Sequence, residues 1–202
     1  MKKYCLELAF LVVAASAVAL AGSIDPAHAQ NRISVGQVMT SLNKSGKTAQ
    51  KVGIDTAAVR RDIEARIQAE GGGNATSAPP VSELLRRLPN FIVQIQFDLN
   101  SDVIRPESWE TVGRIADALH HPLLSGNRFL VVGHTDSSGT REHNLELSDK
   151  RAFAVSELLT TTFRVPNKRL LPIGFGEEQI FDTKNSKAAV NRRVEFINLG
   201  PL

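Results

Sequence analysis

The chain is poor in cysteine. Cys5 is the single one among 202 residues, and it lies within the first few positions. If an N-terminal leader is removed, no thiol remains in the mature protein. That excludes a disulfide, a cysteine nucleophile and a thiolate metal site, even in an oxidising compartment.

Long apolar runs are also missing beyond the N-terminus, so we expect no transmembrane helix in the mature chain. The first 29 residues combine Lys2 and Lys3, an apolar stretch from Leu8 to Gly22, and small residues before Gln30. This layout is typical of a secretory signal peptide, 1–29, cut after Ala29. The alternative is a leader retained as a membrane anchor. Either way, the pattern predicts export to the cell envelope.

The chain lacks a strong excess of charge. Its formal net charge is +3, and residues 81–202 carry equal numbers of basic and acidic side chains. A nucleic-acid-binding surface usually needs a basic face, so nucleic acid is not an expected partner.

A glycine- and proline-rich stretch divides the rest of the chain. Residues 71–83 begin with three glycines and contain two adjacent prolines, which favours a linker. Before it, the 30–70 segment contains an expected amphipathic helix at 55–70, capped by Asp55 or Thr56. Its apolar stripe, Val59, Ile63 and Ile67, is narrow. We expect a solvated helix with one apolar edge, and the alternative is an edge that binds an envelope protein partner.

After the linker the pattern alternates between strands and helices, which predicts a domain over 84–202. Its fold class is α/β (α+β): a two-layer sandwich with a mixed β-sheet in βαβαββ order and helices packed on one face. The expected strands are 91–97, 128–134, 169–176 and 192–199, and the expected helices are 106–121 and 142–163.

One polar stretch, "GHTDSSGTREHNLELSDKRA" (133–152), lies between an expected strand and an expected helix. Asn144, Ser148 and Arg151 are spaced to share one helix face. Asp136 lies in the loop after the strand, where open α/β sheets place their ligands. A fixed carboxylate and a fixed guanidinium complement a ligand that carries both an ammonium and a carboxylate. The spacing fits equally well a loop in which Asp136 and Arg151 pair with each other.

The same stretch resembles the signature of the OmpA-like peptidoglycan-binding domain: TD, a small-residue turn with Gly139, then N-x-x-L-S-x-x-R-A. "FDLNSDVI" (97–104), "GFGE" (174–177) and "NRRVEF" (191–196) extend the resemblance over about 84–199. The resemblance implies non-covalent binding of cell-wall peptidoglycan through the diaminopimelate of the stem peptide, without a cofactor.

The resemblance also implies roles for single residues. Asp136 would receive the ammonium of diaminopimelate and Arg151 its carboxylate. Asn144 and Leu147 would line the groove, while Asp98 and Arg192 match further positions of the family's site. The protein would then lie in the periplasm or at the outer membrane, anchored to peptidoglycan.

Two other kinds of site use the residue types found here. His134, His143, Ser137 and Ser138 could serve a hydrolase, but no G-x-S-x-G motif is present and no pattern places a histidine beside either serine. A metal site built from His134, Asp136 and His143 lacks any recognised ligand spacing. We therefore expect neither an enzyme nor a metal protein.

Overall fold

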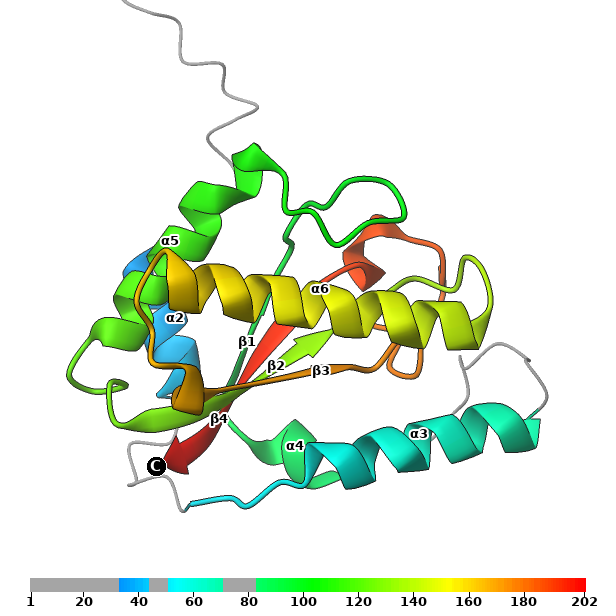
Figure 1. Cartoon of the computed structure of the whole chain (residues 1–202), viewed down its shortest axis with the longest axis horizontal. Helices are drawn as coiled ribbons and strands as arrows, with labels where there is room; N and C mark the ends of the chain where they lie inside the picture. The colour runs from blue at the N-terminus through cyan, green and yellow to red at the C-terminus, as the bar shows by residue number, and fades with distance from the viewer. Residues whose placement is uncertain (1–32, 44–50, 71–82) are drawn as a thin grey trace, which may run out of the picture. The chain divides into compact units, whose positions relative to one another are not determined.

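The computed structural model describes residues 33–43, 51–70 and 83–202. A four-stranded sheet is formed by β1 (Asn90–Val93), β2 (Asn127–Gly133), β3 (Leu170–Gly174) and β4 (Val194–Pro201), in the spatial order β1-β4-β2-β3 (Figure 1). Strands β2 and β3 run parallel, whereas β4 is antiparallel to β1 and β2. The mixed sheet predicted from the sequence is confirmed. The expected leader, 1–29, and the expected linker, up to residue 82, lie outside the described residues.

Two helices make the crossovers between strands. The first is α5 (Trp109–His120), which follows a short 3-10 turn, η2 (Pro106–Ser108), and the second is α6 (Arg141–Thr161). Pro106 occupies the first position of its turn, where a missing N–H costs nothing. Thr140 caps α6 by accepting a hydrogen bond from the His143 N–H at 3.2 Å. The predicted order of strands and helices over this part of the chain is confirmed.

Both faces of the sheet are buried, which differs from the expected two layers. Phe129 and Val131 of β2 pack with α5 and α6, while Leu130 and Val132 pack with α3 (Thr56–Glu70) and α4 (Glu83–Arg87). Successive strand residues point to opposite faces, so helices cover both sides, with α6 above the strands and α3 below them in Figure 1. The expectation of helices on one face is therefore corrected. The β2 run "FLVV" is apolar throughout, as strands buried on both faces are.

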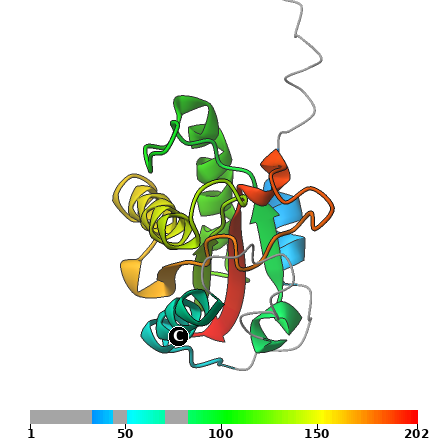
Figure 2. The same ribbon diagram turned by 90° about the vertical axis from the view of Figure 1, so that its right-hand side faces the viewer.

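The segment before the linker belongs to the same compact unit, which runs from Ile33 to Leu202. Helix α2 (Val35–Leu42), which is not among the helices expected from the sequence, begins with a capping box between Ser34 and Gln37. Its Val38 and Leu42 are fully buried in the core formed with α5 and the sheet. In Figure 2, α2 lies beside β1.

Helix α3 uses its apolar edge within the molecule, which corrects the expectation of a solvated helix. Ile63 and Ile67 are buried against the sheet. At the two ends of α3, Arg60 Nη1 lies 2.7 Å from Asp149 Oδ2, and Glu70 Oε2 lies 2.9 Å from Arg141 Nη1. The stripe that suggested a partner surface is thus occupied by the protein's own core.

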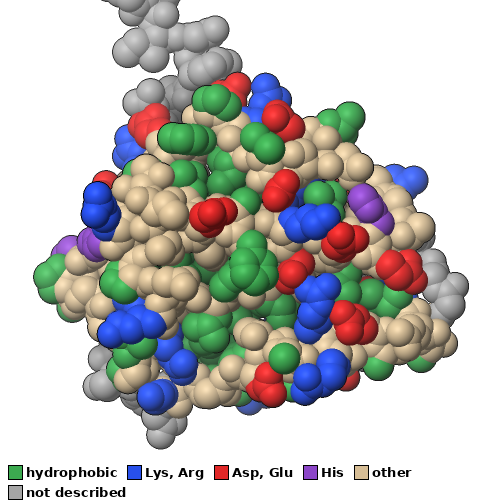
Figure 3. Space-filling model, in the orientation of Figure 1, with side chains coloured by type: hydrophobic (Ala, Val, Ile, Leu, Met, Phe, Trp, Pro, Cys, Tyr) green, Lys and Arg blue, Asp and Glu red, His purple; other side chains and the backbone are tan. Residues whose placement is uncertain are grey.

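The remaining short elements are η3 (Asn167–Arg169) and η4 (Ala189–Asn191), which precede β3 and β4. Basic and acidic side chains are interspersed on the face seen in Figure 3, with no large area of one sign. This distribution agrees with the balanced charge of residues 81–202. Among the described residues, none of the helices is long and apolar enough to cross a membrane.

Candidate functional site

Asp136 lies in the loop between β2 and α6, at the end of the sheet. Its Oδ1 accepts a hydrogen bond from the Ser138 N–H at 2.9 Å, the local turn that aspartate favours. Gly139 follows with a φ of +102°, a conformation that glycine adopts without steric cost. The loop therefore holds the Asp136 carboxylate in a fixed position just before α6 begins.

Arg192 is the ion-pair partner of Asp136. Its Nη1 lies 2.5 Å from Asp136 Oδ2, and the Asp136 side chain is 10% exposed whereas that of Arg192 is 49% exposed. The carboxylate is thus buried, and the guanidinium reaches it from the solvent side. The sequence left open a pairing between Asp136 and Arg151, and the structure assigns that pairing to Arg192 instead.

Arg151 projects from α6 and is buried. Its Nε donates to the backbone carbonyl of Ser101 at 2.9 Å, and its guanidinium lies over the Phe97 ring, 4.9 Å from the ring centre. Burial lowers the pKa of Arg151, and the nearby charge of Arg192 lowers this pKa further. In the described part of the chain, no carboxylate forms a salt bridge with Arg151. The end of this guanidinium is available to an anion from outside.

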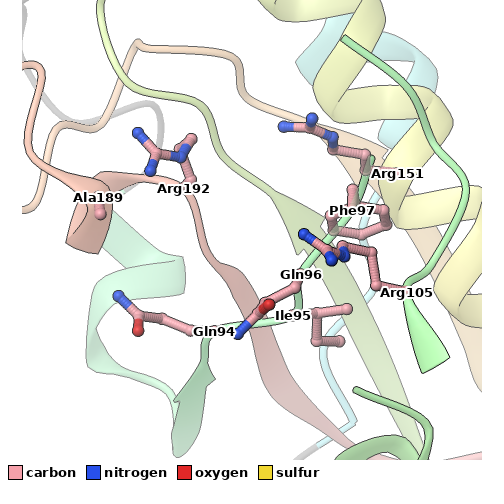
Figure 4. A pocket seen from close by; sticks show the side chains of 8 residues that line it. All are labelled: Gln94, Ile95, Gln96, Phe97, Arg105, Arg151, Ala189 and Arg192. Carbon is pink, nitrogen blue, oxygen red and sulfur yellow. The ribbon is translucent and has the colours of Figure 1, made fainter. Parts of the chain in front are cut away.

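A pocket of about 250 Å³ lies between these arginines. It forms because the β1–β4 ladder ends at the pair Val93 and Val194, after which the two chain segments diverge. The expected first strand, 91–97, is therefore shorter than predicted, and its second half becomes a wall of the pocket. The side chains in Figure 4 line it: Gln94, Ile95, Gln96, Phe97, Arg105, Arg151, Ala189 and Arg192.

Asn144 is buried behind the site and does not line the pocket. Its Nδ2 donates to the Asp136 carbonyl at 3.2 Å and to Glu177 Oε2 at 2.5 Å. These bonds connect the Asp136 loop to the segment after β3. Asn144 therefore positions the loop, which differs from the groove-lining role that the resemblance implied.

Leu147 and Asp98 are not brought into the pocket. Leu147 is half-buried on α6. Asp98 is exposed in the turn after Phe97, with its Oδ1 4.0 Å from Arg105 Nε. Of the six residues predicted for the site, the structure places Arg151 and Arg192 in the pocket wall and Asp136 directly behind Arg192.

No local sequence signal points to Arg105 as a residue of the pocket. It stands alone in a polar turn between Ile104 and Pro106, with no repeat or motif to mark it. Gln94 and Gln96 alternate with Ile95 and Phe97, a pattern that is typical of the exposed side of a strand. That alternation is correct, but the wall they form depends on where the strand leaves the sheet.

The histidines and serines that a hydrolase could use contact other residues and form no catalytic pair with one another in the described part of the chain. His143 Nε2 lies 2.7 Å from Asn100 Oδ1, and Ser137 Oγ donates to Ser186 Oγ at 2.7 Å. His134 is buried, with its ring edge-on to the Phe175 ring. Within the described ranges, no group of three or more His, Cys, Asp or Glu side chains could hold a metal ion.

His134 predicts a measurable pH dependence of stability. Burial lowers its pKa to about 4, and the charge of Arg193 adds to this effect. Because the folded-state pKa lies below the unfolded value of 6.5, the unfolded chain takes up the proton first. The contribution of His134 to the free energy of unfolding is fully present above about pH 6.5. It is lost as the pH falls towards 4, and the loss amounts to roughly 3 kcal/mol. Urea unfolding of wild type and His134→Leu between pH 7.5 and 4.5 measures it. We expect a shallower decline for the variant, and equal declines would contradict the assignment.

These features define the class of the molecule, an α/β domain with an arginine-lined pocket at the end of a mixed sheet. Residues 96–193 match the OmpA family, and this part of the chain belongs to that family. Outer membrane porin F of Pseudomonas aeruginosa is 32% identical over 125 residues, covering 60% of this chain and 34% of the porin.

Two further relatives are similar over shorter stretches. The peptidoglycan-associated lipoprotein of Pseudomonas putida is 35% identical over 107 residues, covering 52% of this chain and 62% of the lipoprotein. An outer membrane protein structure from Borrelia burgdorferi is 31% identical, covers 54% of this chain and 86% of that one, and superposes with a TM-score of 0.44. The chain thus spans less than two thirds of the length of the porin and of the length of the lipoprotein.

Proposed function

We propose that this protein binds peptidoglycan non-covalently, by holding the free end of the diaminopimelate side chain in the stem peptide. That end carries one ammonium and one carboxylate. The observation that carries the proposal is the arrangement of Arg151, a buried arginine that faces a pocket, beside Asp136, a carboxylate held in a fixed position.

The charges of the site support a zwitterionic ligand. Arg151 offers a planar fork whose Nε is already fixed by Ser101, so its remaining N–H groups can bind a carboxylate with little loss of freedom. Asp136 attracts the ammonium. Arg192 is half-exposed, so its side chain can move aside while the Asp136 loop stays in place.

The names of two relatives support peptidoglycan as the partner. One of them is named a peptidoglycan-associated lipoprotein and another an outer membrane porin. Together with the expected leader, these names favour a periplasmic location close to the outer membrane. The proposal includes no covalent step, and it assigns no catalytic residue and no cofactor.

Co-sedimentation with insoluble peptidoglycan tests the proposal. Wild-type protein should pellet with sacculi that contain diaminopimelate, and free diaminopimelate should compete. Arg151→Ala should abolish pelleting, because an unpaired ligand charge costs about 2–5 kcal/mol, or about 30-fold or more in Kd. Asp136→Asn, which keeps the size of the side chain, should weaken binding as well.

The matched control is Arg87→Ala, which removes an exposed arginine of α4 and should pellet like wild type. Melting curves show whether each variant is folded. Arg151→Lys separates charge from geometry, since it keeps the charge but loses the fork, and it should bind with intermediate affinity. A folded Arg151→Ala protein that pellets as fully as wild type would overturn the proposal.

A further inference from the structure

We infer that Arg105 binds a second carboxylate of the ligand, so the site recognises a diaminopimelate peptide in which the neighbouring D-glutamate keeps its free α-carboxylate. This inference rests on the proposed function and names the form of the ligand that the pocket prefers. Within the stem peptide, this carboxylate is the negative group adjacent to diaminopimelate.

The pocket holds more cationic groups than a zwitterion can use. Arg105, Arg151 and Arg192 come from three separate segments, and all three line the same space (Figure 4). None of its lining residues is acidic. When the ammonium of the ligand binds Asp136, the half-exposed Arg192 side chain moves aside, and Arg151 takes the carboxylate of the zwitterion. Arg105 remains available for another anion.

The carboxylates near Arg105 hold it weakly. Asp98 Oδ1 lies 4.0 Å from its Nε, and Glu107 Oε1 lies 3.4 Å from its Nη2. Both acidic side chains are more than half exposed, and exposed ion pairs of this kind contribute little. A ligand carboxylate inside the pocket is better shielded from water and can replace them.

The backbone of Arg105 is fixed beside the pocket. Its N–H donates to the Gln96 carbonyl at 2.9 Å, and Gln96 is itself part of the pocket wall. The proline that follows restricts the preceding residue to extended backbone, as the φ of −69° and ψ of 144° of Arg105 show. The Arg105 side chain therefore starts from a fixed point beside the pocket.

Two soluble stem peptides test the inference, one with D-glutamate and the other with D-isoglutamine before diaminopimelate. They differ only in amidation of the one α-carboxylate. Calorimetry with wild-type protein should give about tenfold weaker binding of the amidated peptide, as expected for one charge-assisted contact at a half-exposed site. Arg105→Gln should bind both peptides equally, at the affinity wild type shows for the amidated one. Arg87→Ala, the matched control, should keep the full preference.

The outcomes separate the two proposals. If wild type binds both peptides with equal affinity, or if Arg105→Gln keeps the preference, the inference about Arg105 is wrong and peptidoglycan binding stands. If wild type binds neither peptide, nor diaminopimelate-containing sacculi, both proposals fail.

Discussion

Replacing Gly133 with alanine is expected to destabilise the protein by about 3 kcal/mol or more, because α6 crosses the sheet directly over this residue. A Cβ built on Gly133 would overlap the carbonyl oxygen of Ser148 and lie 2.9 Å from its carbonyl carbon. Both atoms belong to the backbone of α6, so no side-chain rotation can relieve the overlap. The helix itself has to move away from β2.

Gly174 is in the same position on the neighbouring strand. It pairs with Gly133 in the parallel ladder between β2 and β3, and its Cβ would meet the backbone of Asp149 and the Ser148 hydroxyl. Two adjacent strands thus end in a residue without a side chain beneath one turn of α6. This close contact sets the distance between the sheet and α6, the helix that carries Arg151. The position of Arg151 in the site therefore depends on the two glycines.

Urea unfolding measures the effect of Gly133→Ala, and for a chain of this size the loss corresponds to a melting temperature lower by roughly 6–12 °C. Gly126→Ala is the matched control. A Cβ at Gly126 would meet nothing within 4 Å, so that variant should stay within about 0.5 kcal/mol of wild type. If the two variants are equally stable, α6 does not pack on β2 as described.

Local patterns predicted much of the domain. The βαβαββ order follows from the switch between alternating and helical spacing, which is a property of neighbouring residues. Asp136 and Arg151 could be selected for a similar reason, since one sits in a loop at a strand end and the other on a polar helix face. Such features need only the local sequence.

The rest depends on contacts between distant parts of the chain. The stripe of Ile63 and Ile67 shows that α3 has an apolar edge, but nothing in that stripe says which surface it covers. The partner of Asp136 lies 56 residues away, just before the strand β4, whose neighbours are set by sheet topology. Arg105 lines the pocket because β1 separates from β4 after Val93, although the alternation of side chains continues to Phe97.

The second large effect is expected at Glu178, the buried partner of Arg141. Arg141 Nε and Nη2 donate to the two Glu178 oxygens at 2.8 and 2.7 Å, and both side chains are 1% exposed. This double hydrogen bond raises the pKa of Arg141, and Glu70 raises it further, so the guanidinium stays charged in the folded protein. Glu178→Ala removes the buried carboxylate that holds this charge, and the half-exposed Glu70 compensates only in part, so the change should cost about 3–5 kcal/mol.

The variant should also weaken the ligand site. Arg141 is the first residue of α6, directly after the loop that holds Asp136, and Glu177 next to Glu178 accepts from Asn144. A change at Glu178 therefore reaches the Asp136 loop from both sides. We expect Glu178→Ala protein, at a temperature where it is still folded, to bind peptidoglycan less tightly than wild type.

Thermal and urea unfolding of a small set of variants separates the charge effect from simple loss of packing. Glu178→Gln keeps the size and one acceptor oxygen and should lose less stability than Glu178→Ala. A double variant, Arg141→Met with Glu178→Leu, removes both charges and should recover a large part of the loss, since a buried ion pair can be replaced by apolar side chains of similar volume.

The exposed pair Glu146 and Lys150, with 2.7 Å between Oε1 and Nζ, is the matched control on the outer face of the same helix. Glu146→Ala should melt close to wild type, because water solvates both charges when the pair is broken. Equal losses for Glu178→Ala and Glu146→Ala would mean that burial does not strengthen the Arg141 contact. A larger loss for the double variant than for Glu178→Ala would mean that packing, rather than the missing Glu178 carboxylate, determines the cost.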